Sequence, residues 1–150
     1  MSALLNPNLN PNQNSPHRRR WSVAEYQRQI DLGLLTDEDK VELLEGEVVD
    51  KMPINPPQDS TITRLNRRLS RLIPDACLVR CQNTLELFQS RPEPDFAIVR
   101  GDESDFDTVH PGPNDVALVI EVSDSSLERD RVQKGRIYSK AGIPIYWVVT

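Results

Sequence analysis

The sequence predicts an α/β protein with a mixed central sheet flanked by helices. Residues 116–122 are almost all apolar, which is typical of a strand that is covered on both faces. A helical pattern over residues 125–142 and a second apolar run over residues 143–149 follow directly. This strand–helix–strand order predicts a crossover between two parallel strands. Shorter strand and helix patterns come before it, so we expect the sheet to contain antiparallel strands as well.

One domain of ordinary size is expected, because 150 residues of which 37% are hydrophobic can bury a core. Residues 1–20 are rich in Asn and Pro and end in three arginines, which predicts a disordered tail before a domain at residues 21–150. The net charge of −5 argues against a generally basic nucleic-acid binder. The N-terminus has no signal-peptide pattern and no run reaches ~18 apolar residues, so the cytoplasm is the expected compartment.

Capping and turn residues mark the first elements. Ser22 followed by Glu25 forms a capping box, which predicts a short helix that ends near Gly33. Two short strands are expected over residues 41–52, on either side of the Glu-Gly pair at residues 45–46. The N-terminal part of the domain is therefore expected to contribute one helix and one pair of strands.

A second helix is expected after the prolines at residues 53–57, which should break the chain. Asp59 or Ser60 is the expected cap, and the helix should run to about Ile73. Its apolar face is formed by Ile62, Leu65, Leu69, Leu72 and Ile73. Its opposite face carries Arg64, Arg67, Arg68 and Arg71. A solvated amphipathic surface explains these arginines, and a phosphate-contacting surface is the alternative.

Three short strands should follow, at residues 77–81, 84–88 and 95–99. Cys77 and Cys81 would lie roughly 13 Å apart on one strand, which is too far for a disulfide. The chain has two histidines, His17 and His110, and neither is close to the cysteines in sequence. A zinc site made of Cys and His ligands is therefore not expected.

The third predicted helix has charged residues on its apolar side. At about 100° per residue, its apolar stripe is formed by Leu127, Ile137, Tyr138 and Ala141. Asp130 and Lys134 fall inside this stripe, where a charge is costly unless it is paired or used. An ion pair between these two residues is one explanation. The other is that Lys134, close behind the strand-end residue Glu121, belongs to a metal-dependent hydrolytic site.

Three carboxylates stand at the ends of predicted strands. Asp95 opens one strand, Glu121 lies near the end of the most apolar strand, and Glu42 begins the first strand. Mg²⁺ prefers oxygen ligands, usually one or two carboxylates together with waters and substrate phosphate. A lysine beside such an ion could orient the attacking water. Turn capping at Asp95 and a solvent-facing strand end at Glu121 would explain the same residues without a function.

Several blocks of the sequence occur in a characteristic order. They are residues 41–47, residues 52–54, residues 93–99 (EPDFAIV), residues 118–127 (LVIEVSDSSL), the pair Asp130 and Lys134, and residues 138–149. In this combination the chain, from about Trp21 to its end, resembles the Uma-two family of restriction endonucleases. That family belongs to the PD-(D/E)xK nuclease superfamily. The resemblance implies a restriction-endonuclease-like fold and an endonuclease that hydrolyses phosphodiester bonds, with DNA as the partner.

The resemblance also implies roles for individual residues. Asp95 and Glu121 would bind Mg²⁺, or Mn²⁺ in its place, together with the carbonyl of Val122. The lysine that usually stands two residues after the Glu is replaced here by Ser123, and Lys134 on the following helix matches the displaced lysine of this family. Glu42 would be the first acidic residue of the site, with Glu47 as the alternative. A homodimer is implied by analogy, because cleavage of both strands usually takes two sites.

The chain departs from the family pattern at three places. Residues 56–60 contain no histidine, Ile145 stands where an acidic residue is usual, and the sequence stops at Thr150 inside an apolar strand. These departures predict that the nuclease domain is truncated at its C-terminus. They also support a second hypothesis, a catalytically inactive nuclease-fold protein that binds DNA or a partner. A metal-dependent phosphatase or other small hydrolase is a third, weaker interpretation.

Overall fold

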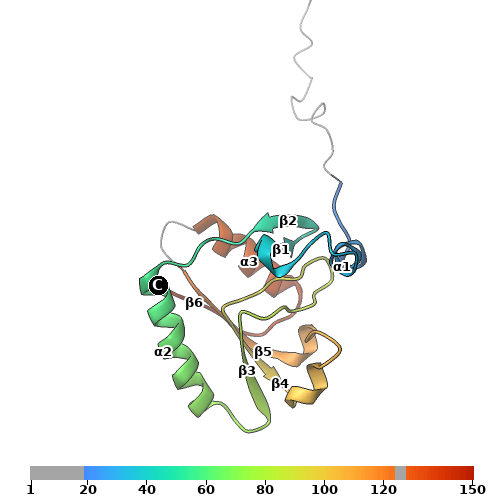
Figure 1. Cartoon of the computed structure of the whole chain (residues 1–150). Helices are drawn as coiled ribbons and strands as arrows, with labels where there is room; N and C mark the ends of the chain where they lie inside the picture. Colours follow the sequence, from blue (N-terminus) through green and yellow to red (C-terminus); the bar gives the residue numbers. More distant parts are fainter. Residues whose placement is uncertain (1–18, 124–127) are drawn as a thin grey trace, which may run out of the picture.

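The structure, a computed structural model, describes residues 19–123 and 128–150 (Figure 1). For residues 128–130 it describes the backbone and not the side chains. Its helices are α1 (Val23–Asp31), α2 (Pro56–Leu72) and α3 (Glu128–Lys140), with short 3₁₀ turns at Asp37–Asp39, Glu103–Phe106 and Pro113–Asp115. Its strands are β1 (Val41–Leu44), β2 (Glu47–Asp50), β3 (Cys77–Cys81), β4 (Phe96–Arg100), β5 (Val116–Val122) and β6 (Tyr146–Val149). In the part of the chain described, no helix is long and apolar enough to cross a membrane.

A four-stranded mixed sheet with the order β3-β4-β5-β6 forms the centre of the molecule. Strands β3, β4 and β5 pair antiparallel, and β5 pairs with β6 in parallel. The crossover between β5 and β6 contains α3, as the apolar runs and the helical pattern between them predict. The α/β fold with a mixed central sheet is therefore confirmed.

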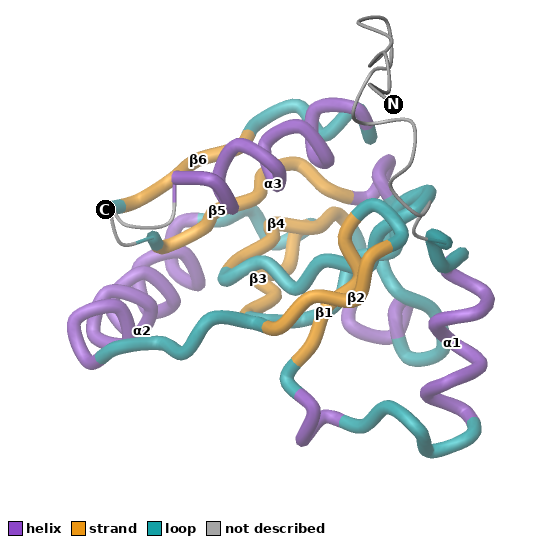
Figure 2. Tube along the Cα trace, turned by 90° about the horizontal axis from the view of Figure 1, so that it is seen from above, coloured by secondary structure: helices purple, strands orange, loops and turns teal. Residues whose placement is uncertain are grey.

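The two faces of this sheet are covered by different helices (Figures 1 and 2). On one face, Ala97 and Val119 of the sheet pack with Ile137 and Tyr138 of α3. On the other face, the buried residues are Phe96, Ile120 and, from α2, Ile62. Neighbouring residues of β4 and β5 thus point to opposite faces, as the period of two in a strand requires. Any polar residue in register with Ala97 and Val119 faces α3.

Strands β1 and β2 form a separate hairpin that lies against the α3 face of the central sheet. Glu45 and Gly46 both have positive φ values, 50° and 82°, which is the conformation of a two-residue type I′ turn. A Cβ at Gly46 would lie 2.7 Å from the Arg20 Cβ, so glycine is required here for space as well as for φ. Leu44 of β1 packs into the core on the α3 face. The hairpin predicted around these two residues is confirmed, and it carries Glu42 towards the sheet.

The start of α2 differs from the prediction. The helix begins at Pro56 and is capped by Asn55, whereas Asp59 or Ser60 was the expected cap. The Asn55 side chain accepts a hydrogen bond from the Gln58 N–H, and the Gln58 side chain accepts one from the Asn55 N–H. Proline is tolerated in the first turn because those N–H groups have no partner inside the helix. The two prolines at residues 56–57 therefore open the helix rather than interrupt the chain.

The strand predicted at residues 84–88 is absent from the described structure. Leu85 and Leu87 are buried, which explains the alternating pattern. Their backbone, however, bonds to loops: the N–H groups of Leu85 and Glu86 donate to the carbonyls of Pro92 and Pro111. Proline has no N–H to return such a bond, so no ladder can form. The segment is a loop in which Leu85 and Leu87 are buried while Phe88 is 92% exposed.

Smaller differences concern the ends of elements. Strand β6 begins at Tyr146 rather than at Ile143, because the Ile143 N–H still bonds to the α3 carbonyl of Tyr138. Strand β4 begins one residue after Asp95. Leu72, expected on the apolar face of α2, is 79% exposed. The first residues of the helical pattern expected over residues 125–142 lie outside the described residues.

Candidate active site

The strand register brings Asp95 and Glu121 together. Ala97 of β4 pairs with Val119 of β5 in an antiparallel ladder. Asp95 stands two residues before Ala97, and Glu121 stands two residues after Val119, so the two carboxylates occupy facing positions on neighbouring strands. The period of two along a strand turns both side chains towards α3. Residues 26 positions apart in sequence thus become cross-strand neighbours.

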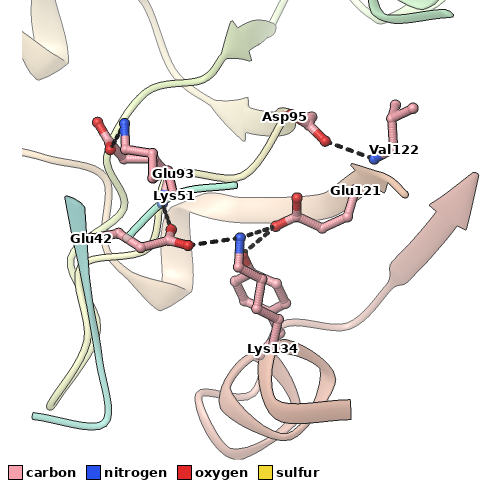
Figure 3. Close-up of polar contacts among 8 residues, drawn as sticks. Glu42, Lys51, Glu93, Asp95, Glu121, Val122 and Lys134 are labelled. Carbon is pink, nitrogen blue, oxygen red and sulfur yellow. Dashed lines mark hydrogen bonds and ion pairs between the residues drawn. The ribbon is translucent and has the colours of Figure 1, made fainter. Parts of the chain in front are cut away.

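Asp95 is held by the backbone of β5. Its Oδ2 accepts a hydrogen bond of 2.7 Å from the Val122 N–H (Figure 3). Burial raises the pKa of Asp95, while the hydrogen bonds from the Val122 N–H and the Gln82 side chain lower it. A hydrogen bond with the Glu121 carboxyl and the nearby Lys134 charge lower it further. The carboxyl group is therefore fixed in position and lies within contact of Glu121.

Lys134 of α3 lies between two carboxylates (Figure 3). Its ammonium nitrogen is 3.1 Å from Glu42 Oε1 and 3.2 Å from Glu121 Oε1, and its side chain is 15% exposed. The Tyr138 hydroxyl, one turn further along α3, donates a 3.0 Å hydrogen bond to the same oxygen of Glu121. The inward orientation of Lys134 predicted from helical periodicity is therefore confirmed. The partner proposed for it, Asp130, has a side chain outside the described residues.

Glu42 reaches the site from the β1–β2 hairpin. Its Oε1 contacts Lys134, and its Oε2 accepts a 2.9 Å hydrogen bond from the Glu93 N–H. The Glu93 carboxylate is itself paired with Lys51, which follows β2. Glu42 is 5% exposed, whereas Glu47, the alternative for the first acidic residue, is exposed on β2. Of these two glutamates, the structure places Glu42 in contact with Lys134.

Burial controls the protonation of the central carboxyl group. Burial, together with the charges of Asp95 and Glu42, raises the pKa of Glu121 to about 7, although Lys134 acts in the opposite direction. For Lys134, burial alone would lower the pKa, but the attraction of Glu121 and Glu42 outweighs it and the pKa lies above its usual value. Lys134 thus stays charged, and Glu121 holds its proton more tightly than an ordinary glutamate.

The carboxylate pair suits a hard divalent cation. Asp95 and Glu121 both have pKa values raised by burial even though the Lys134 charge lowers them, so a divalent cation would supply positive charge that two ionised carboxylates still lack. Within the described residues no group of three His, Cys, Asp or Glu side chains is arranged to hold a metal. Mg²⁺, however, is usually bound by one or two carboxylates, with waters and substrate phosphate completing its shell. The donor set therefore fits Mg²⁺ better than a metal that needs an all-protein cage.

These groups open onto a cleft of about 1080 Å³ between the hairpin and the sheet. Its walls include the acidic residues Asp37, Glu42, Asp50, Glu93, Asp95 and Glu121. They also include the basic residues Lys40, Lys51, Arg80, Arg91, Arg131 and Lys134. The four arginines of α2 are exposed and are not among the residues that line this cleft. The candidate site residues therefore share this cleft with side chains of both charges.

Comparison with known proteins assigns the family. The sequence model of the Uma2 family, described as "Putative restriction endonuclease", matches residues 23–150. The chain belongs to the Uma2 family. A crystal structure of "a putative nuclease belonging to DUF820" from Anabaena variabilis has the same fold, with a TM-score of 0.55 and 16% sequence identity over 79% of this chain and 70% of that chain. The search among curated proteins found no match. The restriction-endonuclease-like fold expected from the sequence is therefore confirmed.

In this Uma2 protein, the residues singled out in the sequence come together. Asp95, Glu121, Lys134 and Glu42 form one connected cluster, and Val122 contributes its N–H to Asp95. Sequence reasoning missed the Tyr138 hydroxyl, because tyrosine in an apolar stripe is ordinarily a core residue. It also missed Gln82, which pairs with Asp95 across β3 and β4. A correct strand register was the signal that would have found Gln82.

Proposed function

We propose that this protein is a Mg²⁺-dependent endonuclease that hydrolyses phosphodiester bonds in DNA. The observation that carries the proposal is the buried Lys134, held between Glu42 and Glu121 with Asp95 beside them. A buried charged cluster of this kind costs folding free energy, and a role in catalysis would explain its presence. Membership of the Uma2 family and the restriction-endonuclease-like fold support a nuclease.

Asp95 and Glu121 would hold the ion, with the Val122 carbonyl as a third ligand, and Mn²⁺ could take the same place. When bound, Mg²⁺ would neutralise charge on the phosphate and acidify a water molecule. The Val122 N–H and Gln82 keep the Asp95 carboxyl in position for this task. The Tyr138 hydroxyl and the Lys134 ammonium both contact Oε1 of Glu121, which fixes this carboxyl group beside Asp95.

Lys134 would position the attacking water and stabilise negative charge that develops on the phosphate. Its raised pKa means that it acts as a cation and hydrogen-bond donor, not as the base that removes the proton. Glu42 is a positioning residue in this scheme, because it contacts Lys134 and is itself anchored by the Glu93 N–H. In-line attack would join the water oxygen to phosphorus and break the bond from phosphorus to the leaving oxygen. One water proton passes to solvent and the leaving oxygen takes up a proton, so that one new strand ends in a phosphate and the other in a hydroxyl. A homodimer would place two such sites on the two strands of a duplex.

The test is cleavage of supercoiled plasmid DNA with and without Mg²⁺ or Mn²⁺. Asp95→Asn and Glu121→Gln preserve the size of each side chain and should abolish metal-dependent cleavage while the circular dichroism spectrum stays unchanged. Cleavage that survives both substitutions would refute the assignment. DNA retention by the wild-type protein without cleavage in any divalent metal would instead favour the inactive, DNA-binding alternative. Size-exclusion chromatography of the same samples tests the homodimer.

A further inference from the structure

Arg80 of β3 is a cation without an anionic partner. Its guanidinium carbon lies 5.7 Å from the centre of the Phe106 ring, and it forms no ion pair with any described residue. Its Nε atom is buried and has no hydrogen-bond partner. Burial lowers the pKa of Arg80, and no nearby carboxylate compensates for the lost hydration. An unpaired, partly dehydrated guanidinium in a cleft is suited to bind an anion.

Tyr146 of β6, on the other side of the site, also has a buried polar atom without a hydrogen-bond partner. Its hydroxyl is buried and makes no hydrogen bond, and the residue lines the same cleft. Its ring is fixed by Tyr138, with ring centres 5.2 Å apart, and by Gly135, where a Cβ would lie 3.3 Å from the ring. A buried hydroxyl without a partner is costly, so this position favours a ligand that accepts a hydrogen bond.

The strand register places both residues in one row across the sheet. Arg80 pairs with Ala97, Ala97 with Val119, and Val119 with Tyr146. Three strand spacings of ~4.8 Å separate the ends of this row by roughly 14 Å. Glu121 on β5 and Asp95 directly before β4 lie two residues from this row, at the same end and on the same face of the sheet. Arg80 therefore flanks the carboxylate pair on the β3 side, and Tyr146 flanks it on the β6 side.

We propose that Arg80 and the Tyr146 hydroxyl bind phosphates on either side of the one that is cut, so that the DNA strand crosses the sheet from β3 to β6. The proposal rests on the nuclease function and adds the path of the substrate. Its chemistry is complementary: phosphate oxygens accept hydrogen bonds from the guanidinium and the hydroxyl, while the metal site between them receives the central phosphate. Both contacts are to the backbone, so they supply affinity and register rather than sequence choice.

Binding of a fluorescein-labelled 20-base-pair DNA duplex in EDTA tests the path without cleavage. Arg80→Met should weaken binding about tenfold, and the slope of log affinity against log salt should fall by about 1, because one charge contact to phosphate is lost. Tyr146→Phe should weaken binding roughly fivefold with an unchanged slope, because a neutral donor releases no counterion. Arg80→Lys keeps the charge and should restore the slope.

Arg67→Met is the matched control, since it removes the same charge from the exposed face of α2. Equal affinity and equal slope for Arg80→Met and Arg67→Met would overturn the proposal, as would wild-type binding by Tyr146→Phe. The double variant Arg80→Met with Tyr146→Phe should show the product of the two single effects, because the sites are far apart. Plasmid cleavage in Mg²⁺ is scored separately. Absent cleavage with this binding pattern would refute the nuclease function and leave the path of the strand standing.

Discussion

Both faces of the central sheet are covered by a helix, but the side chains buried on the two faces differ in polarity. On the α2 face, Ile62, Phe96 and Ile120 are in apolar contact, and the charges of α2 point to solvent. On the α3 face, an equally buried surface contains Lys134 and Glu121 as well as apolar residues. One strand, β5, supplies both surfaces, because Ile120 and Glu121 are consecutive residues that point in opposite directions.

The residues of the α2 face are those that stabilise the fold, whereas the α3 face also contains charged residues that lower stability and are explained by a functional site. The α2 face follows the general rule that buried side chains are apolar, and its packing stabilises the fold. The α3 face departs from that rule at Lys134, Glu121 and Glu42, where apolar residues of similar size would often be more stable. Substitutions on the two faces should therefore differ in kind: stability alone on one, and stability with catalysis on the other.

Lys134→Met should have the largest effect. It removes the ammonium and leaves Glu42 and Glu121 facing each other without a counter-charge, so we expect a loss of about 3 kcal/mol in unfolding free energy. DNA cleavage should fall by roughly a thousandfold or more, because a group that stabilises charge in the transition state is lost. Urea unfolding and plasmid cleavage measure the two quantities.

The control for this prediction is Lys134→Met combined with Glu121→Gln. The double variant should recover much of the lost stability, since the unpaired carboxylate is gone, but none of the activity. If the double variant recovers no stability, the loss in Lys134→Met does not come from an unpaired carboxylate.

Ile120→Ala probes the α2 face at the neighbouring residue. Ile120 is 1% exposed, so removing most of its side chain should lower the unfolding free energy by about 3 kcal/mol. The rate of cleavage per folded molecule, measured at a temperature where the variant is fully folded, should stay within about twofold of wild type. A loss of activity comparable with that of Glu121→Gln would mean that the two faces are coupled through β5.

Much of this contrast could be predicted from sequence, because alternation and helical periodicity report which side a residue faces. Lys134 was placed on the buried side of its helix in this way, and Glu121 at the end of a buried strand. Contacts between distant elements were harder to obtain. Glu42 reaches Lys134 only because a type I′ turn returns the hairpin over the sheet. Arg80 faces the cleft only in the register that pairs it with Ala97.

The strand wrongly predicted at residues 84–88 shows the same limit. Alternation at Leu85 and Leu87 correctly indicated burial, but burial does not specify the backbone partner. That partner is a pair of proline carbonyls, supplied by Pro92 and Pro111. Non-local hydrogen bonding decided the outcome, and a local pattern contains no information about it.

The stability of the metal-free protein should depend on pH through the α3 face. Glu121 has a pKa of about 7 when folded and the usual value of 4.5 when unfolded. Between these values the folded protein keeps a proton that the unfolded chain releases, so stability should fall as pH rises from about 4.5 to about 7. We expect a loss of about 3 kcal/mol, measured by urea unfolding in EDTA. Glu121→Gln should remove most of this slope and leave the part that comes from Asp95, whose pKa is also raised, whereas Ile120→Ala should keep all of it.

The arginines of α2 should give the smallest effects. Arg64, Arg67 and Arg68 are exposed, and they are absent from the lining of the cleft. Changing each of them to alanine should alter the unfolding free energy by no more than about 0.5 kcal/mol, as measured by urea unfolding. In plasmid cleavage at moderate salt, the triple variant should stay closer to wild type than the single substitution Arg80→Met. A larger loss of cleavage in the triple variant than in Arg80→Met would place the DNA on the α2 face. The bound strand would then be separated from Asp95 and Glu121, because the sheet lies between that face and these carboxylates.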